Sequence, residues 1–542
     1  MGSSSHEFAT SSGGSASKQV PGATQPRGGE TPDGLRRSKG SGGEGIRILH
    51  VTPELSSLPA EFARIQPNIT AKAGGLADVT AALFEGFHRM GSDVHVTLPH
   101  YRRLFGVDPN HFDPSSWREY RRKNGLETVH LAEDRSFYYR EKLYDEATNL
   151  DIALAFQREV INNVIPRVDP DLVHCHDWMT GLVPAAARRL GIPSVFTIHN
   201  THTERLTLEC IESHGIDAAE FWSSLYFENY PTHYESTRQH NRVDLLASGI
   251  IGSDFVTTVS PTFMDELSQG SQGSLAHPLR AHLEWRCSCG AARGILNAPH
   301  RSYDPSIDPS LVRCFDATTA TEGKAINKAA FQEMTGLAVD PDAALYFWPS
   351  RLDPVQKGCQ LLAEILGQLT ADQMGSRIQL AIVADGPFQK HFHEIVSMHG
   401  LHGQVAIRDF NEDLSRLGYA AADFALVPSR YEPCGLAQMI ALRYGTLPVA
   451  HRTGGLRDTV RQLQGSDIGN GFLFENYDSN GLRWAISESI RFHGLAKPEK
   501  ARVVSRVMKE AGLAFSPEQM MLEYSDVYQG TAGQVSGWTV SP

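Results

Sequence analysis

The sequence predicts an α/β protein with two domains, each a parallel β-sheet covered by helices. Its 542 residues exceed what one small core can organise. Short apolar segments alternate with helical segments along both halves, an order typical of parallel sheets with right-handed crossovers. Several apolar segments end in a glycine-containing loop before a helix, as in doubly wound sheets that bind a ligand at their carboxyl edge.

The overall composition is that of a globular protein, with 41% hydrophobic and 21% charged residues. The net charge of −12 gives no reason to expect a nucleic-acid partner. No apolar run approaches the length of a membrane span. Seven scattered cysteines indicate a reducing compartment, and no metal site is expected at Cys287 and Cys289 because the sequence offers them no further ligands at suitable spacing.

Residues 1–45 are predicted to be disordered, because this segment is rich in Ser and Gly and has almost no large apolar residues to bury. It lacks the apolar region of a secretory signal, so we expect a cytoplasmic protein. A Ser-rich transit peptide to a plastid is the weaker alternative, since acidic residues such as Glu7 and Glu30 count against it.

The first ordered domain is predicted over 46–285 and begins with a buried strand at 46–51. Lys72, Gly74 and Gly75 then precede a helix over 80–90. Glycines let the backbone approach a phosphate closely, and the lysine supplies a cation. Strand 94–99 follows.

Residues 101–150 are expected to form a loop-rich insertion with an edge hairpin around 136–143. A strand over 171–176 ends in His176 and Asp177, and a strand over 192–199 ends in His199 and Asn200. These polar residues are expected at the carboxyl edge of the sheet.

The predicted domain boundary lies in the loop 270–293, after a strand over 255–259. The second domain, 293–510, is expected to contain strands at 344–348, 378–383, 405–408, 424–427 and 448–450. Arg351 and Lys357 follow the first of these strands. The guanidinium of Arg351 offers a two-pronged contact and Lys357 a point charge, which suits the grip of an anion.

Two strand–glycine–helix junctions occur in succession between 427 and 460. The first contains Glu432, Cys434, Gly435 and Leu436, and the second contains Thr453, Gly454 and Gly455. Backbone N–H groups at a helix start can cradle a pyrophosphate, and a carboxylate can hold sugar hydroxyls. Cys434 is interpreted as a neighbour of the ligand and not as a nucleophile.

The segments SRYEPCGL, QMIALRYGTLPV and TGGLRDTV, together with KAGGLADV and HDW in the first half, resemble the glycogen and starch synthases. The resemblance extends from residue 46 to about 528, thinly over 100–240 and densely over 345–460. It implies two Rossmann-like domains facing across a cleft, the B-type glycosyltransferase architecture. It also implies that a C-terminal helix, predicted over 515–530 with Ser516 as its N-cap, packs back on the first domain.

The resemblance implies retaining transfer of glucose from ADP-glucose or UDP-glucose to the non-reducing end of an α-1,4-glucan, with no cofactor and no metal. It implies catalytic roles for His176, Arg351, Lys357 and Glu432. The implied donor-binding residues are Lys72, Gly74, Gly75, Cys434, Gly435, Leu436, Thr453, Gly454 and Gly455. The implied acceptor-side residues are Asp177, His199 and Asn200. The side chain of His176 would lie beside the anomeric carbon of the donor glucose, where positive charge develops in the transition state.

Two alternatives stay open at this point. The loop 201–205 reads THTER, where the family has an apolar and aromatic acceptor loop, which suggests a related retaining glycosyltransferase with a different acceptor. Departures at Ala77, Thr148, Ile152 and Ala298 suggest a non-catalytic glucan-binding or regulatory homologue. Five charged or polar site residues are nevertheless present, which favours an active enzyme because drift alone would not spare all of them: Lys72, His176, Arg351, Lys357 and Glu432.

Overall fold

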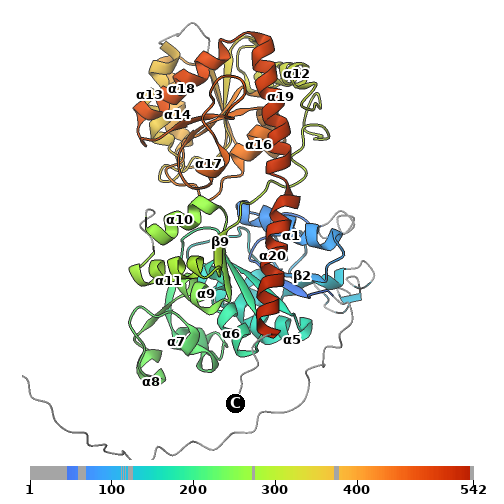
Figure 1. The fold of residues 1–542 in the computed structure, drawn as a ribbon, viewed down its shortest axis with the longest axis vertical. Helices are drawn as coiled ribbons and strands as arrows, with labels where there is room; N and C mark the ends of the chain where they lie inside the picture. The colour runs from blue at the N-terminus through green and yellow to red at the C-terminus, as the bar shows by residue number, and fades with distance from the viewer. Residues whose placement is uncertain are drawn as a thin grey trace, which may run out of the picture. The chain divides into compact units, whose positions relative to one another are not determined.

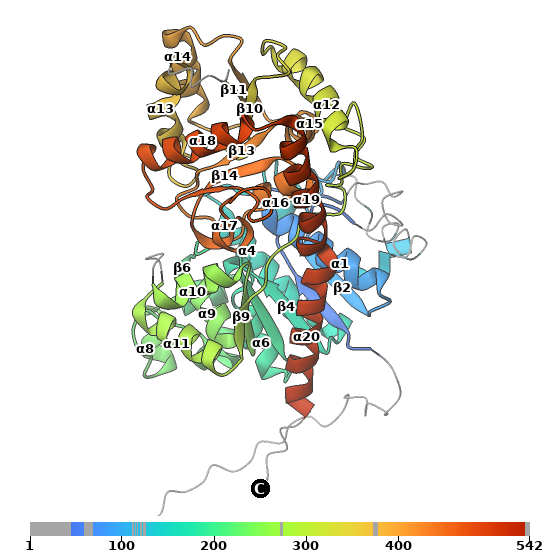
Figure 2. The same cartoon turned by 45° about the horizontal axis from the view of Figure 1, so that its top comes forward.

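The computed structural model describes residues 45–58, 69–110, 113, 115, 118–119, 122, 126–270, 275–371 and 378–536. The predicted disorder of residues 1–45 therefore lies outside the described residues, apart from Gly45. From Gly45 onward, the described chain contains two large β-sheets of seven and six strands. Figures 1 and 2 show both sheets with helices packed on their faces.

The first sheet has the order β3-β2-β1-β4-β5-β8-β9, and all its pairings are parallel. Its strands are β1 (Ile48–Val51), β2 (Val94–Pro99), β3 (Val129–Ala132), β4 (Leu172–His176), β5 (Ser194–Ile198), β8 (Phe255–Thr258) and β9 (Ala292–Gly294). The helices of this half are α1 (Gly75–Arg89), α3 (Arg135–Tyr138), α4 (Asn149–Glu159), α5 (Ile165–Val168), α6 (Val183–Arg189), α7 (Leu208–Ser213), α8 (Tyr234–Arg238), α9 (Leu245–Gly252), α10 (Pro261–Gln269) and α11 (His277–Ser288). The central strands β1 and β4 are buried at every position, as expected for strands covered on both faces.

The second sheet has the order β12-β11-β10-β13-β14-β15 and is also entirely parallel. Its strands are β10 (Ala344–Trp348), β11 (Ile378–Val383), β12 (Val405–Arg408), β13 (Phe424–Val427), β14 (Leu447–His451) and β15 (Phe472–Phe474). The helices are α12 (Ala320–Thr335), α13 (Cys359–Ala371), α14 (Gln389–His399), α15 (Glu412–Ala421), α16 (Ala437–Arg443), α17 (Gly454–Thr459), α18 (Ser479–His493) and α19 (Lys497–Ala514). All five predicted strands are confirmed, while β15 was not predicted.

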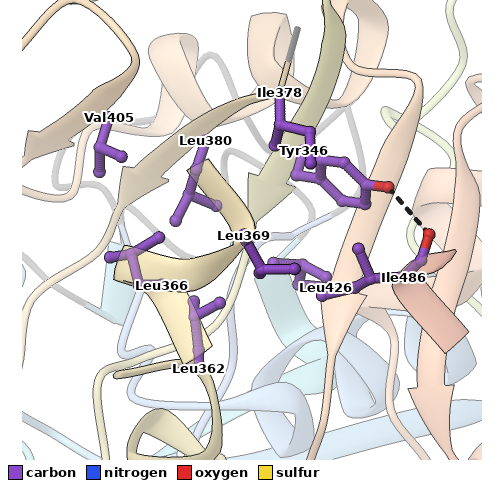
Figure 3. A pocket seen from close by; sticks show the side chains of 9 residues that line it. All are labelled: Tyr346, Leu362, Leu366, Leu369, Ile378, Leu380, Val405, Leu426 and Ile486. Carbon is purple, nitrogen blue, oxygen red and sulfur yellow. Dashed lines mark hydrogen bonds between the residues drawn. The ribbon is translucent and has the colours of Figure 1, made fainter. Parts of the chain in front are cut away.

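The core of this half is apolar around Tyr346, whose hydroxyl oxygen lies 2.7 Å from Ser489 Oγ in a hydrogen bond and 3.5 Å from Ile486 O. Figure 3 shows Tyr346 beside leucine and isoleucine side chains of α13, β11 and α18 around a small apolar pocket. The pocket measures about 20 Å³, room for about one water molecule and no substrate.

The C-terminal helix α20 (Pro517–Ser536) returns to the first sheet. It runs beside α1 in both views (Figures 1 and 2). Its Tyr528 hydroxyl and His174 Nδ1 are 2.7 Å apart in a fully buried hydrogen bond. Gly86 of α1 leaves the space that Met521 of α20 fills, because a Cβ there would lie 1.9 Å from the Met521 sulfur.

Two local predictions are wrong. The expected hairpin around 136–143 is instead the short helix α3, because Asp134 caps it by accepting from Ser136 N at 2.7 Å. The loop expected over 270–293 contains the helix α11, with Pro278 in its first turn. The strand β9 that follows joins β8 in the first sheet, so this sheet extends to Gly294.

Within the described residues, no helix is both long enough and apolar enough to cross a membrane.

Candidate active site

Each sheet reverses its strand order at one point, and several of the polar residues predicted from the sequence follow the strand ends beside these points. The first sheet reverses between β1 and β4, where Glu54 and Asp177 follow the strand ends. The second sheet reverses between β10 and β13, followed by Arg351 and Glu432. Ligands of open α/β sheets bind at such reversal points, outside the carboxyl ends of the strands.

Lys357 and Glu432 form the clearest charged pair of the second sheet. Lys357 Nζ donates to Glu432 Oε2 at 2.6 Å, and Ser429 Oγ donates to the same oxygen at 2.9 Å. The two charged side chains are only 12% and 10% exposed. Gly358 permits this approach, because its φ is +73° and a Cβ would lie 2.1 Å from Pro428 O.

Arg351 lies at the same strand edge and is solvent-exposed. Within the described residues it makes no hydrogen bond or ion pair. Burial raises the pKa of the nearby Tyr431, and the positive charge of Arg351 acts in the opposite direction. The site therefore offers one paired cation and one cation that is available to a ligand.

The first glycine junction leads into the helix α16, which begins at Ala437. Gly435 has φ +74°, a conformation that glycine adopts without strain. Leu436 is the N-cap and no side chain caps the helix, which leaves backbone N–H groups at its start available to an anion. Burial raises the pKa of the Cys434 thiol far above its ordinary value, so the thiol stays protonated and is a poor nucleophile.

The second glycine junction makes contacts that the sequence did not predict. Gly454 N donates to Glu266 Oε1 at 2.8 Å, and Thr453 Oγ1 donates to the same oxygen at 3.4 Å. A Cβ on Gly454 would lie 2.0 Å from Glu432 O, and one on Gly455 would lie 2.1 Å from Cys434 O. These two glycines thus allow α17 to pack tightly on the first junction, and Glu266 of α10 occupies one N–H of the helix start.

The lysine–glycine–glycine loop of the first sheet is held by Glu54. Its carboxylate accepts from Ala73 N at 2.9 Å and Gly74 N at 3.2 Å, and it accepts a short hydrogen bond from the Tyr144 hydroxyl. Burial raises the pKa of Glu54, although these hydrogen bonds act in the opposite direction. The sequence interpretation did not assign Glu54 or Tyr144 to the site.

Lys72 forms an ion pair with Asp78 at 3.1 Å and keeps 40% of its side chain exposed. The start of α1 lies beside the first glycine junction of the second sheet, since a Cβ on Gly75 would lie 3.5 Å from Leu436 Cδ1. Ser260 Oγ also donates to Pro433 O at 2.6 Å. The first glycine junction of the second sheet therefore lies against two segments of the first half, the start of α1 and the start of α10.

The carboxylate of Asp177 bonds to the other two predicted acceptor-side residues, His199 and Asn200. Its carboxylate accepts from His199 N at 2.7 Å and from Asn200 Nδ2 at 2.8 Å. Burial raises the pKa of Asp177 to about 7, while hydrogen bonds from His199 and Asn200 act in the opposite direction. Its backbone has φ +58°, a strained conformation for a residue other than glycine that often marks functional sites.

His176 is fully buried in this structure. Its Nδ1 lies 3.0 Å from His199 Nε2, and its Nε2 has no hydrogen-bond partner among the described residues. Burial lowers the pKa of His176 far below its ordinary value, so the imidazole is neutral. Within the described residues, neither Lys72 nor His176 makes a hydrogen bond or ion pair with Arg351, Lys357 or Glu432.

One group of side chains in the described residues has a geometry compatible with a metal ion. The nearest ligand atoms of His50, His174 and His176 all lie within 4.8 Å of one another. Both nitrogens of His174 already have partners, at 2.7 Å to Tyr528 and 2.6 Å to Thr197. Hydrogen bonding therefore accounts for His174 without an ion.

The altered loop 201–205 leads into a short antiparallel pair, β6 (Arg205–Thr207) with β7 (Arg242–Asp244). Thr203 Oγ1 donates to Asp244 Oδ1 at 2.7 Å, and Arg205 Nε lies 2.9 Å from Asp244 Oδ2. The polar residues that replace the expected apolar loop thus form their own anchored structure.

Comparison with known proteins agrees with this geometry. The family model described as starch synthase catalytic domain matches residues 47–281, and the model described as glycosyl transferases group 1 matches residues 344–491. A glycogen synthase of Exiguobacterium sibiricum is 32% identical over 481 residues, which cover 83% of this chain and 94% of the relative. A glycogen synthase of Geotalea uraniireducens is 32% identical over 455 residues, covering 78% and 89%.

Among solved structures, the catalytic domain of starch synthase IV from Arabidopsis thaliana, bound to ADP and acarbose, matches with a TM-score of 0.72 and 26% identity. The match covers 90% of this chain and all of that chain. The chain shares these similarities and also has two parallel sheets of Rossmann strand order, with charged residues at their reversal points. It therefore belongs to the glycogen and starch synthase family of glycosyltransferases.

Proposed function

We propose that this protein transfers glucose from a nucleoside diphosphate glucose to the non-reducing end of an α-1,4-glucan, with retention of configuration. The observation that carries the proposal is the Lys357–Glu432 pair of 2.6 Å at the reversal point of the second sheet, together with Arg351, which has no hydrogen-bond or ion-pair partner in the described part of the chain. Two cations and one carboxylate at one edge match a ligand with a diphosphate and sugar hydroxyls.

Arg351 and Lys357 stabilise the negative charge that grows on the departing diphosphate. Preorganised charges act most strongly when they face the charge that develops in the transition state. Glu432 holds Lys357 in place before the donor binds and then accepts from hydroxyls of the glucose. The uncapped start of α16 after Gly435 adds backbone N–H donors to the same diphosphate.

The first sheet supplies the surroundings of the reacting carbon. His176 provides a neutral polar group beside the anomeric centre, where positive charge develops as the nucleotide leaves. Its side chain is buried in this structure, so this role requires the covering residues to rearrange when the donor binds. Asp177 holds His199 and Asn200 on the acceptor side, and Lys72 contacts the donor phosphates.

ADP-glucose is the donor we propose, with UDP-glucose as the alternative. The support is the relative of known structure, starch synthase IV, which was solved with ADP. We further propose that transfer needs no metal, because Arg351 and Lys357 supply the positive charge for the diphosphate.

The test is incorporation of label from ADP-[14C]glucose or UDP-[14C]glucose into polymer, with glycogen present or absent. Label in polymer that depends on glycogen, unchanged by EDTA and lost in Glu432→Gln, is the expected result. A labelled small-molecule product without polymer would favour a glycosyltransferase with a different acceptor. Absence of any donor consumption would contradict the proposal.

A further inference from the structure

A charged pocket lies in the C-terminal half, at the edge of the second sheet opposite the candidate active site. It has a volume of about 170 Å³ and lies among α12, α18 and α19, which are labelled in Figure 2. Asp423 and Leu447, which line it, stand at the amino ends of β13 and β14. The active-site loops follow the carboxyl ends of the same two strands, so the two sites are separate.

The pocket is strongly cationic. Four lysines line it, Lys324, Lys328, Lys497 and Lys500, against a single carboxylate, Asp423. The remaining lining residues are His493 and uncharged residues. Asp342 lies 3.8 Å from Lys497 just outside the lining, and both side chains are largely exposed. Even with this second carboxylate, positive charge exceeds negative charge.

The ammonium groups of two of the lysines, Lys324 and Lys328, are held in place by hydrogen bonds within the protein. Lys324 Nζ donates to Ala420 O, Tyr444 O and Thr446 Oγ1 at 2.9 to 3.1 Å, which uses all three of its protons. Lys328 Nζ donates to Asp423 Oδ2 at 2.8 Å and to Ala343 O at 2.5 Å. Within the described residues, no carboxylate bonds to Lys324, so its charge is not neutralised by a bonded partner when it is protonated.

The other two lysines, Lys497 and Lys500, have N–H groups that could donate to a ligand. Within the described part of the chain, Lys500 Nζ donates only to His493 O, at 2.7 Å. Lys497 is exposed, and its one contact with a described residue is the long ion pair with Asp342. Both stand in the first turn of α19, three residues apart, so their ammonium groups lie on the same side of that helix.

The positive charges repel one another across the pocket. Burial lowers the pKa of Lys324 to about 7, and the charge of Lys328 lowers it further while Asp423 acts in the opposite direction. Burial also lowers the pKa of Lys500; the negative charge of Asp423 acts in the opposite direction, while the charges of Lys328 and Lys497 lower it further. An anion in the pocket would relieve this repulsion.

We propose that this pocket binds the phosphate group of a small phosphomonoester. A phosphate dianion matches the excess of positive charge better than a single carboxylate, and lysine ammonium groups are common phosphate ligands. The volume of about 170 Å³ suits a compound of a few carbon atoms, and Phe492 and Ala501 offer apolar contact for its carbon part. The proposal is independent of the glucosyl transfer, because none of these residues belongs to the active site.

The test is calorimetric titration with glycerol 3-phosphate at low salt, with glycerol and acetate as an uncharged and a singly charged comparison. Binding of glycerol 3-phosphate alone is expected. The double variant Lys497→Gln/Lys500→Gln should weaken it at least about tenfold, since each charge-assisted hydrogen bond lost costs on the order of a factor of ten. The matched control is Lys509→Gln, an exposed lysine of the same helix outside the pocket.

The variant Lys357→Ala separates this pocket from the active site, and affinity for glycerol 3-phosphate should be unchanged in it. Absence of binding to the wild-type protein would overturn the proposal. Equal affinity in the wild type and in a folded double variant would also overturn it, as would loss of binding in Lys357→Ala alone. Circular dichroism and the thermal midpoint establish that the double variant is folded.

Discussion

Lys357 Nζ lies 2.6 Å from Glu432 Oε2, although the two residues are 75 positions apart and follow different strands. The pair spans the reversal point between β10 and β13. Each group is nearly buried, so each would be costly to leave without its partner. Because each charge already has its partner, the pair is fixed in the structure before any ligand binds.

Replacing Lys357 by Ala is expected to lower kcat about a hundredfold to a thousandfold, because the departing diphosphate loses one preorganised positive charge that stabilises it. Initial rates with ADP-glucose and glycogen measure this loss. The control is Lys390→Ala, whose side chain is 88% exposed and which should keep the wild-type rate. A kcat within a few-fold of wild type for Lys357→Ala would remove Lys357 from the catalytic group.

Replacing Gly358 by Ala is expected to lower both the thermal midpoint and the transfer rate. Its φ is +73° and the new Cβ would lie 2.1 Å from Pro428 O, so the loop that carries Lys357 must move. Gly400→Ala is the matched control, because its φ of +63° has the same strain but no atom lies within 4 Å of the Cβ. The control should cost about 1–2 kcal/mol from the left-handed backbone alone.

The difference between the two glycine variants isolates the steric contact. A Gly358→Ala protein as stable and as active as Gly400→Ala would show that the loop does not depend on close approach to Pro428.

The sequence predicts the strands of both sheets well, because each buried parallel strand is a continuous apolar run followed by polar or glycine-containing residues. The strand at 344–348 and the strand at 424–427 were both predicted with the observed bounds of β10 and β13. Arg351 and Glu432 follow these strands, so their convergence could be predicted from topology alone. The glycogen and starch synthase resemblance then supplied their roles.

Contacts between residues distant in sequence could not be predicted in this way. Tyr144 reaches Glu54 from an irregular loop that has no period, and Glu266 reaches Gly454 from α10 of the other half. Glu54 alone carried a signal, because it follows the end of β1 as Asp177 follows the end of β4. The helix α11 was missed because its composition is polar and its apolar positions are few.

Asp177 is expected to make stability depend on pH. Burial raises its pKa from 3.8 to about 7, so between about pH 4 and pH 7 the folded protein holds a proton that the unfolded chain has released. The folded state therefore loses stability as pH rises through this window, at up to about 1.4 kcal/mol per pH unit. The contribution is complete below the unfolded pKa and is gone above the folded pKa.

Asp177→Asn removes this titration while keeping a polar side chain of the same shape. The free energy of unfolding of the wild type, measured relative to this variant by urea unfolding, should fall as pH rises from about 5 to about 7. A difference that is constant over this range, or that rises with pH, would contradict a raised pKa at Asp177.

Tyr528→Phe is expected to destabilise the protein by about 1–3 kcal/mol, because it removes a buried hydroxyl and leaves the nitrogen of His174 without its partner. The bond it removes, 2.7 Å between Tyr528 and His174 Nδ1, fixes α20 on the first sheet. The His174 ring in turn packs against the His176 ring in a tilted arrangement, with ring centroids 4.2 Å apart, so a smaller fall in transfer rate should accompany the loss of stability. Tyr230→Phe, at a side chain 92% exposed, is the control and should change neither quantity. If the thermal midpoints of the two variants were equal, the Tyr528–His174 hydrogen bond would contribute nothing measurable to holding α20 on the first sheet, since Phe keeps the ring that packs there and lacks only the hydroxyl.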